Sequence, residues 1–199
     1  MVMAEFDIAF EYTDNIEGGY SHDPNDSGGE TYRGIARKFN PDWDGWEIID
    51  RAKSQLNVLN DFELTKELKR LPDLDAMVRD FYYRKYWDPV SGDKIKSQAV
   101  AGLLYDCAVN HGIGDAAIWA QQTLNALNRG TYKKLTVDGN IGGQTWGVLN
   151  EHYNTERREK YLIIGIAGLR IAYYIELSKG RYMRGWLSRA SSFISKIKP

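Results

Sequence analysis

The stretch SQAVAGLLYDCAVNHG, residues 97–112, decides the fold class of this chain. Its apolar side chains recur every three or four positions, the spacing of one face of an α-helix, and they are Val100, Leu103, Leu104, Cys107 and Ala108. Gly112 follows, as glycine commonly does at the C-terminus of a helix. Because so apolar a helix needs neighbours to cover it, we expect one mostly helical fold with this segment inside.

A second apolar stretch, YLIIGIAGLRIAYYIELS at residues 161–178, approaches the length of a membrane span. Arg170 near its middle would cost roughly 2.5–3.5 kcal/mol in a bilayer. Charged residues also crowd both flanks. We therefore expect a buried central helix and no stable membrane span, with a helix at a partner interface as the remaining alternative.

Most other segments also have helical periodicity. We expect helices at residues 6–16 and 46–54, from an N-cap at Asp61, from residue 73 to Pro89, from an N-cap at Asp115, and in the segments 143–152 and 181–196. In the fourth of these, Met77, Phe81 and Arg84 share a face, with Val78, Tyr82 and Tyr86 beside them. Residues 20–36 are rich in Gly, Asn, Asp and Ser, which predicts turns and a small β-hairpin beside the helices. The best boundary between two halves is VSGDKIKS, residues 90–97.

The composition narrows the function classes. The chain has 199 residues, 43% of them hydrophobic, and a net charge of -1, which gives no general argument for binding nucleic acid. Cys107 is the single cysteine, so no internal disulfide can form. The three histidines lack the spacing of metal ligands, and we expect no metal and no cofactor. Because the N-terminus does not resemble a signal peptide, we expect a cytoplasmic protein until another route releases it.

The stretch EGGYSHDPND, residues 17–26, carries the candidate chemistry. Cleavage of a glycosidic bond usually needs one protonated and one ionised carboxyl group. At the C-terminal end of a helix and beside Tyr20, Glu17 would have a raised pKa, as a general acid requires. Asp26 on the following turn would be the charged partner, and Thr31 would help to hold a water molecule. The alternative is that Glu17 caps a surface helix and that Asp26 is an ordinary turn residue.

The stretch EGGYSHDPNDSGGETYRGIA, residues 17–36, resembles the N-terminal signature of glycoside hydrolase family 108, the N-acetylmuramidases of phages and bacterial secretion loci. The resemblance extends over nearly the whole chain. It continues through YYRKYWDPVSGDKI (82–95), LLYDCAVNHGIGDAAIWAQQTLN (103–125), VDGNIGGQTWGVLN (137–150) and LRIAYYIELSKGRYMRGWLSRA (169–190).

The resemblance implies a mostly α, lysozyme-like, two-lobed helical fold with a small β-hairpin near the N-terminal catalytic helix. It implies a catalytic region at residues 1–95 and a helical peptidoglycan-binding region packed against it at 96–195. The implied activity is hydrolysis of the bond between N-acetylmuramic acid and N-acetylglucosamine. The partner would be the peptidoglycan glycan strand, reached in the periplasm or cell wall, with a holin-like pore for release.

The family's catalytic acid corresponds to Glu17, and the supporting roles correspond to Asp26 and Thr31. The chain departs from the family pattern at Ser27, where Pro is common, and at Tyr32, where Asn is common. The change at Tyr32 puts a water-holding role at that position in doubt and would narrow the groove. A single displacement by water is the expected mechanism.

Several aromatic and polar residues have two interpretations. We predict that Tyr20, Tyr32, Tyr83 and Trp87 contact substrate, since aromatic faces pack well on sugar rings, although an aromatic stripe at helical spacing is more often core. Asn110 would hydrogen-bond the glycan, or cap the helix before Gly112. Four arginines near the C-terminus form either a basic rim for anionic wall polymer or solvated helix faces: Arg170, Arg181, Arg184 and Arg189.

Two other functions stay open beside the enzyme. A cell-wall-binding module without hydrolysis would use Glu17 only as a helix cap. A secretion-associated factor would use the apolar segment 161–178 to meet a partner. Tests of hydrolysis, binding and solubility separate the three.

Overall fold

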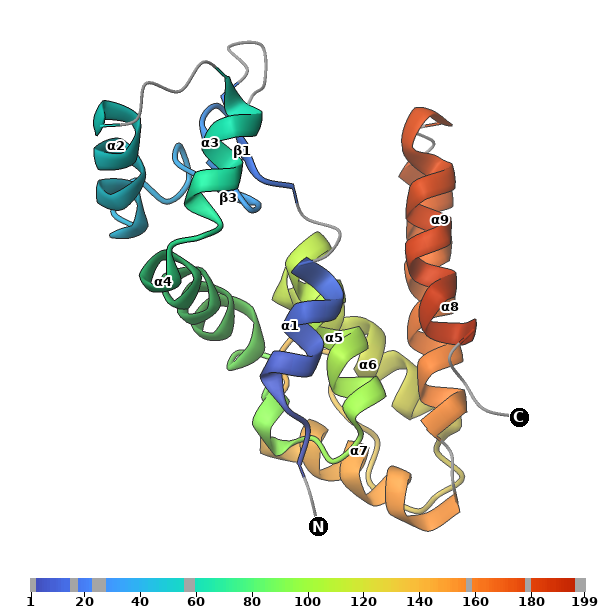
Figure 1. Ribbon diagram of the computed structural model, residues 1–199. Coiled ribbons are helices and arrows are strands. Elements are labelled where there is room, and N and C mark those ends of the chain that lie inside the picture. The colour runs from blue at the N-terminus through green and yellow to red at the C-terminus, as the bar shows by residue number, and fades with distance from the viewer. Residues whose placement is uncertain are drawn as a thin grey trace. The chain divides into compact units, whose positions relative to one another are not determined.

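The structure is a computed structural model that describes residues 3–14, 18–22, 28–55, 60–156, 159–177 and 180–195. Figure 1 shows that helices make up most of it. The chain divides into two compact units, one of Phe10–Tyr83 and one of Met1–Ala9 with Arg84–Pro199. The first helix, α1 (Phe6–Asp14), therefore contributes to both units.

The unit Phe10–Tyr83 contains a small antiparallel sheet and three further helices. The strands, in the spatial order β1-β2-β3, are β1 (Tyr20–Ser21), β2 (Thr31–Tyr32) and β3 (Ile35–Ala36). Tyr20 pairs with Tyr32, and Tyr32 pairs with Ile35. The helices are α2 (Gly45–Gln55), α3 (Asp61–Leu68) and α4 (Pro72–Tyr82). The sheet confirms the short strands expected after the first helix.

The start of α3 corrects one prediction. The N-cap is Asn60 and not Asp61, because the Asn60 side chain accepts a hydrogen bond from the backbone N–H of Glu63 at 3.0 Å. Asp61 is the first helical residue. Its carboxylate accepts a hydrogen bond from the backbone N–H of His22 at 3.0 Å, so it ties the helix to the strand β1 segment.

Helix α4 confirms part of the expected face. Its buried residues are Leu74, Val78 and Tyr82, so Val78 and Tyr82 of that face lie in the core. Met77 and Phe81 are half-buried, and Arg84, just after the helix, is exposed. The α-helix ends at Tyr82 and continues as a π-helix, η1 (Tyr83–Trp87), before Pro89. A π-helical turn takes up one more residue than an α-helical turn, so it rotates the following side chains to a new direction. A uniform period of 3.6 residues cannot predict this rotation.

The other unit is a set of packed helices. They are the 3₁₀ turn η2 (Gly92–Lys94), α5 (Gln98–His111), α6 (Ile113–Leu127), α7 (Gly143–Glu156), α8 (Glu159–Leu177) and α9 (Gly180–Ser195). Helices α5, α6 and α8 pack against one another, and α9 runs alongside α8 (Figure 1). Helix α5 is buried as expected, from Val100 to Ala108.

One glycine makes the corner between α5 and α6. Gly112 has a φ of 91°, a conformation that side chains disfavour. Its backbone N–H donates to the carbonyl of Ala108 at the end of α5. Because α6 starts directly after this corner, at Ile113, the predicted N-cap Asp115 lies instead in the first helical turn.

Helix α8 confirms the prediction of a buried helix at residues 161–178. Its inner side buries Leu162, Ile163, Ile166, Ala167 and Tyr174, while Tyr161, Ile164 and Ile175 on the outer side are exposed. Among the residues that the structure describes, no helix is long and apolar enough to cross a membrane. The mostly α, two-unit fold class with a small sheet after the first helix is thus confirmed.

Candidate functional site

The two central catalytic candidates, Glu17 and Asp26, lie outside the described residues. The structure does describe the elements that flank them in the chain. Glu17 precedes β1 by three residues, and Asp26 falls in the connection between the paired strands β1 and β2. The candidate site is therefore described through its supporting strands.

Glu30 is the centre of a charged network beside these strands. Its carboxylate accepts hydrogen bonds from the Tyr20 hydroxyl at 2.8 Å, from Arg37 at 2.6 Å and from Lys53 at 2.8 Å. Arg37 also forms a two-pronged ion pair with Asp50. The network joins the sheet to α2, and it fixes the end of the β1–β2 connection.

The electrostatics of Glu30 decide its chemical role. Burial by itself would raise the pKa of Glu30, but the hydrogen bonds from Lys53, Arg37 and Tyr20 outweigh burial and lower the pKa to about 2. A carboxylate held ionised in this way cannot donate a proton near neutral pH. Glu30 thus supports the strands and is not the general acid. The sequence did not predict this role of Glu30, because nothing in the spacing of the motif indicates that the glutamate is ionised and largely covered.

Tyr20 and Tyr32 lie in the core of their unit. Both rings are buried. The backbone N–H of Tyr20 donates to the Thr65 hydroxyl at 2.8 Å, which docks β1 against α3. Burial first, and then the hydrogen bond to Glu30, raise the pKa of the Tyr20 hydroxyl. The structure places both tyrosines as supports of the strands, and their predicted contact with substrate stays a prediction.

Gly18 and Gly19, which follow Glu17, differ in the structure. A Cβ atom on Gly19 would lie 2.1 Å from Cγ2 of Thr65, so this glycine is required by the close approach of α3. Among the described residues, a Cβ atom on Gly18 would meet nothing within 4 Å.

Thr31, the third catalytic candidate, begins β2. Its backbone is fixed by pairing with Ser21 on one side and Ala36 on the other. Its hydroxyl donates to the carbonyl of Gly29 at 3.2 Å, and the side chain is half-buried. The sheet therefore holds Thr31 at the end of the connection that contains Asp26.

The remaining aromatic candidates, Tyr83 and Trp87, begin and end the π-helix η1 and belong to different units. Tyr83 is half-buried. Trp87, in the other, is fully buried, packs edge-on against Phe6 and Tyr105, and donates its indole N–H to Asp93 at 2.7 Å. For Trp87 the core interpretation describes the structure, because both faces of a fully buried ring are covered.

Asn110 matches the capping alternative. Its amide donates to the carbonyl of Asp106 at 2.7 Å, within the last turn of α5, and the side chain is exposed. Its predicted contact with the glycan is not tested by this hydrogen bond.

The prediction for the C-terminal arginines is wrong for two of them. Arg170 is fully buried, and its guanidinium donates to the Asp106 carboxylate at 2.6 Å. Arg189 donates to the other oxygen of Asp106 at 2.7 Å. These arginines form neither a basic rim nor a solvated face, since both are used to neutralise an acid inside the helical unit. Arg184 is exposed, and the side chain of Arg181 is outside the described residues.

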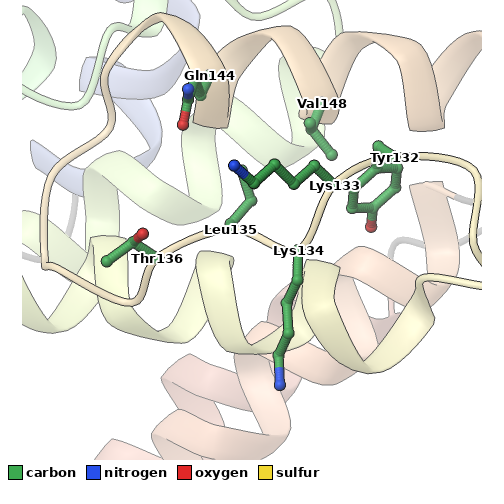
Figure 2. Close-up of a pocket in the computed structure, with 7 residues that line it drawn as sticks. All are labelled: Tyr132, Lys133, Lys134, Leu135, Thr136, Gln144 and Val148. Carbon is green, nitrogen blue, oxygen red and sulfur yellow. The ribbon is translucent and has the colours of Figure 1, made fainter.

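The second unit contains a pocket of about 390 Å³ (Figure 2). Its walls are the chain segment after α6 and one side of α7, and the residues that line it are Tyr132, Lys133, Lys134, Leu135, Thr136, Gln144 and Val148. The sequence analysis did not predict this pocket, because its two walls come from separate elements. Among the described residues, no group of three or more His, Cys, Asp or Glu side chains is arranged to hold a metal ion.

Comparison with known proteins adds three findings. The profile of glycosyl hydrolase 108 matches residues 10–112, and a profile described as a predicted peptidoglycan domain matches residues 115–191. The solved structure of Brucella abortus SagA has 24% sequence identity and a TM-score of 0.59, and the match covers 96% of this chain and 92% of that one. No match was found among curated proteins.

The first profile spans more than half of the chain and includes Glu17, Asp26 and Thr31, and the likeness to SagA supports the helical fold over nearly the full length. The chain belongs to the glycosyl hydrolase 108 family, and a peptidoglycan domain follows its hydrolase region.

Proposed function

We propose that the chain is an N-acetylmuramidase, which hydrolyses the bond between N-acetylmuramic acid and N-acetylglucosamine in peptidoglycan. The observation that carries the proposal is the glycosyl hydrolase profile over residues 10–112, followed directly by the peptidoglycan domain at 115–191. A glycosidase joined to a peptidoglycan domain acts on the glycan of the cell wall.

In this proposal Glu17 is the general acid and Asp26 the ionised partner. A protonated glutamate is needed at the leaving oxygen, and a charged carboxylate is needed opposite it. Glu30, a described acid four residues after Asp26, has a pKa lowered to about 2 and so stays ionised near neutral pH. Thr31 would orient the attacking water from β2. Glu17, which corresponds to the catalytic acid of the family that the chain resembles, would donate the proton.

The direct test replaces Glu17 with glutamine, which keeps the size of the side chain and removes the acid. We expect Glu17→Gln to fold normally and to lose on the order of 10²–10⁴-fold in the rate of peptidoglycan hydrolysis. Glu47→Gln is the matched control, because Glu47 is an exposed acid on α2 within the same family region. The measurement is release of reducing ends from purified peptidoglycan. A Glu17→Gln protein as fast as the parent would remove Glu17 from the mechanism.

The products identify the bond and the stereochemistry. Mass spectrometry of the released muropeptides is expected to find N-acetylmuramic acid at the reducing end. Nuclear magnetic resonance of the first product formed separates inversion from retention at the anomeric carbon, and a single displacement by water predicts inversion. Products with N-acetylglucosamine at the reducing end would assign the other bond and contradict a muramidase.

A second candidate function is binding to the cell wall without hydrolysis. The peptidoglycan domain at residues 115–191 favours it specifically. Sedimentation with insoluble peptidoglycan, run together with the reducing-end assay, distinguishes the two. Binding without new reducing ends would support the module. We also propose, from the family resemblance alone, action in the periplasm or cell wall after release through a holin-like pore.

A further inference from the structure

One wall of the pocket, the segment 132–136 after α6, is fixed to α6 by hydrogen bonds, and α7 is the other wall. Asn125, in the last turns of α6, both donates to the carbonyl of Leu135 at 2.9 Å and accepts from its N–H at 2.8 Å. Asn128 donates to the carbonyl of Tyr132 at 2.7 Å, and the Tyr132 hydroxyl donates back to α6 at Leu124. The wall of the pocket is therefore held in place before any ligand arrives.

A second anchor holds the far end of the same segment. The side-chain oxygen of Gln121 accepts from the N–H groups of Asp138 and Gly139, and its amide donates to Asp138 and to the carbonyl of Asn140. Gln121 is itself buried. Two anchors from α6 thus fix the loop at both ends, and a preordered site loses less entropy when it binds a ligand.

The side chains that line the pocket are basic, polar and apolar, with no acid among the seven. Figure 2 shows the Lys133 side chain reaching across the space between the loop and α7, toward Gln144, while Lys134 points away from α7. Gln144 lies in the first turn of α7, where backbone N–H groups and the helix dipole also favour negative charge. Leu135 and Val148, the apolar residues of the lining, lie on opposite sides of the Lys133 side chain (Figure 2).

These features fit a small anionic group attached to a short alkyl chain. Lys133 and Gln144 would bind the anion, and Leu135 and Val148 would contact a methyl group or methylene chain. The volume of about 390 Å³ admits a few amino acid residues and is in the range of small-ligand sites.

We propose that this pocket binds a carboxylate of the peptide stem of peptidoglycan, with Lys133 as the residue that recognises the charge. The inference rests on the proposed function for the source of the anion. Binding of a stem carboxylate would give the peptidoglycan domain a preference for peptidoglycan that still carries its peptide stems. A phosphate group, free or bound to a polymer, is also an anion that Lys133 could bind. The experiment below distinguishes a phosphate from the carboxylate of the peptide stem.

The test uses the full chain and four probes of defined chemistry. These are N-acetylglucosaminyl-N-acetylmuramic acid with a tetrapeptide stem, the same disaccharide without the stem and with its lactyl carboxyl group blocked as the methylamide, and inorganic phosphate with chloride as its salt control. The disaccharide lacks the bond that the proposed activity cuts, so binding is measured without hydrolysis. Binding is followed by nuclear magnetic resonance of the methyl groups of Leu135, Thr136 and Val148, which line the pocket.

We expect the stem-bearing disaccharide to shift these methyl signals and the stem-free one not to. Lys133→Gln should weaken that binding about tenfold, the value of one lost charged hydrogen bond. Lys160→Gln is the matched control, with the same change of charge at an exposed position of α8 that does not line the pocket, and should change affinity less than twofold. Lys133→Arg, which keeps the charge, should restore most of the binding.

Three outcomes would overturn the proposal: equal loss in both glutamine variants, no methyl shift with the stem-bearing probe, or a Lys133-dependent shift with inorganic phosphate alone. The last would assign the pocket to a phosphate group. Hydrolysis by the parent and by Glu17→Gln is measured separately. Binding of the stem without hydrolysis of the glycan would contradict the proposed enzymatic function and support the stem-binding pocket. Hydrolysis without binding of the stem would support the enzymatic function and contradict the pocket.

Discussion

Asp106 is a buried carboxylate that two guanidinium groups neutralise. Arg170 on α8 binds one oxygen and Arg189 on α9 binds the other, so the acid on α5 links three helices. Arg170 also donates from Nε to His111 at 3.2 Å and to the Tyr174 hydroxyl at 3.0 Å. Breaking such a network leaves a charge buried without its counter-ion, which costs far more than the loss of an exposed ion pair.

Replacement of Asp106 with asparagine tests this network. We expect Asp106→Asn to lower the free energy of unfolding by about 3 to 5 kcal/mol, because Arg170 stays buried and loses its charge partner. Glu67→Gln is the control, because the Glu67–Arg70 pair is exposed and its loss should cost less than about 1 kcal/mol. Urea denaturation of the three proteins measures both effects. Equal costs would mean that the buried pair contributes no more than a surface pair.

His111 makes the stability of the helical unit depend on pH. Burial, and then the nearby charge of Arg170, lower the pKa of His111 to about 4, from an ordinary value of 6.5. The charge of Asp106 raises the pKa of His111 and the charge of Arg189 lowers it, and both effects are smaller. Between pH 6.5 and 4 the unfolded chain therefore binds a proton that the folded chain does not.

The free energy of unfolding should consequently fall as the pH drops from about 6.5 toward 4. In His111→Gln, the part of this pH dependence of the unfolding free energy that comes from His111 should disappear. Urea midpoints of the parent and the variant at pH 7, 6 and 5 give the comparison. Glu30, whose pKa is lowered on folding from 4.5 to about 2, begins to lose its stabilising effect as the pH falls through 4.5, so midpoints at pH 7, 6 and 5 lie above most of that effect. Parallel pH profiles for the two proteins would contradict the assignment to His111.

At the scale of elements, two glycines of α8 have opposite roles. A Cβ atom on Gly165 would lie 2.4 Å from Cγ2 of Thr123, so α8 approaches α6 closely at this point. A Cβ atom on Gly168 would meet nothing within 4 Å, because that side of the helix is exposed. The first glycine is required by helix packing, and the second only lowers the stability of the helix.

The matched pair Gly165→Ala and Gly168→Ala separates these roles. We expect Gly165→Ala to destabilise the protein by about 1 to 3 kcal/mol, since α6 and α8 must move apart. Gly168→Ala should stabilise it by up to about 1 kcal/mol through helix propensity. Thermal unfolding followed by circular dichroism measures both. A loss of stability in Gly168→Ala would indicate that something outside this chain packs on the exposed side of α8.

At the scale of the whole molecule, the N-terminal segment belongs with the C-terminal half. The backbone N–H of Ala4 donates to the carbonyl of Ile95 at 2.8 Å, and Glu5 exchanges hydrogen bonds with Gln98. Phe6 packs edge-on against both Trp87 and Tyr105. Residues 1–9 thus complete a unit whose other residues begin at Arg84.

Truncation of the Phe6 side chain tests whether the N-terminal segment stabilises the unit that begins at Arg84. Phe6→Ala should lower the free energy of unfolding by about 2 kcal/mol, less than a fully buried phenylalanine, because Phe6 is half-buried. Because Phe6 contacts Trp87, the fluorescence of the tryptophans should report the change. Phe62→Ala is the control, since Phe62 is exposed and should change stability by less than about 0.5 kcal/mol. Equal effects would place Phe6 outside the core.

The division into functional regions belongs to this scale as well. A catalytic region at residues 1–95 and a binding region at 96–195 stay a prediction. The family profiles meet at residues 112 and 115, whereas the compact units meet at residues 83 and 84. These boundaries differ because sequence similarity, packing and function are separate properties of a chain.

The sequence by itself determined the helical class, the apolar segments that became α5 and α8, the short strands after the first helix, and the family. Those features are local, since a helical period or a motif is complete within a few turns of chain. The predicted N-cap of α3 was one residue too late and that of α6 three residues too late, because Asn60 and Gly112 compete with equally plausible neighbours.

Only the tertiary structure decided how the charged residues are used. Arg170 and Asp106 are 64 residues apart, and nothing near either one in the sequence marks it as part of a buried pair. Glu30 and Lys53 also pair although nothing near either residue in the sequence indicates it. Lys133 and Gln144 likewise line one pocket although they come from separate elements. Burial and pairing depend on which groups meet in space, and the cost of burying a charge is offset only by those neighbours.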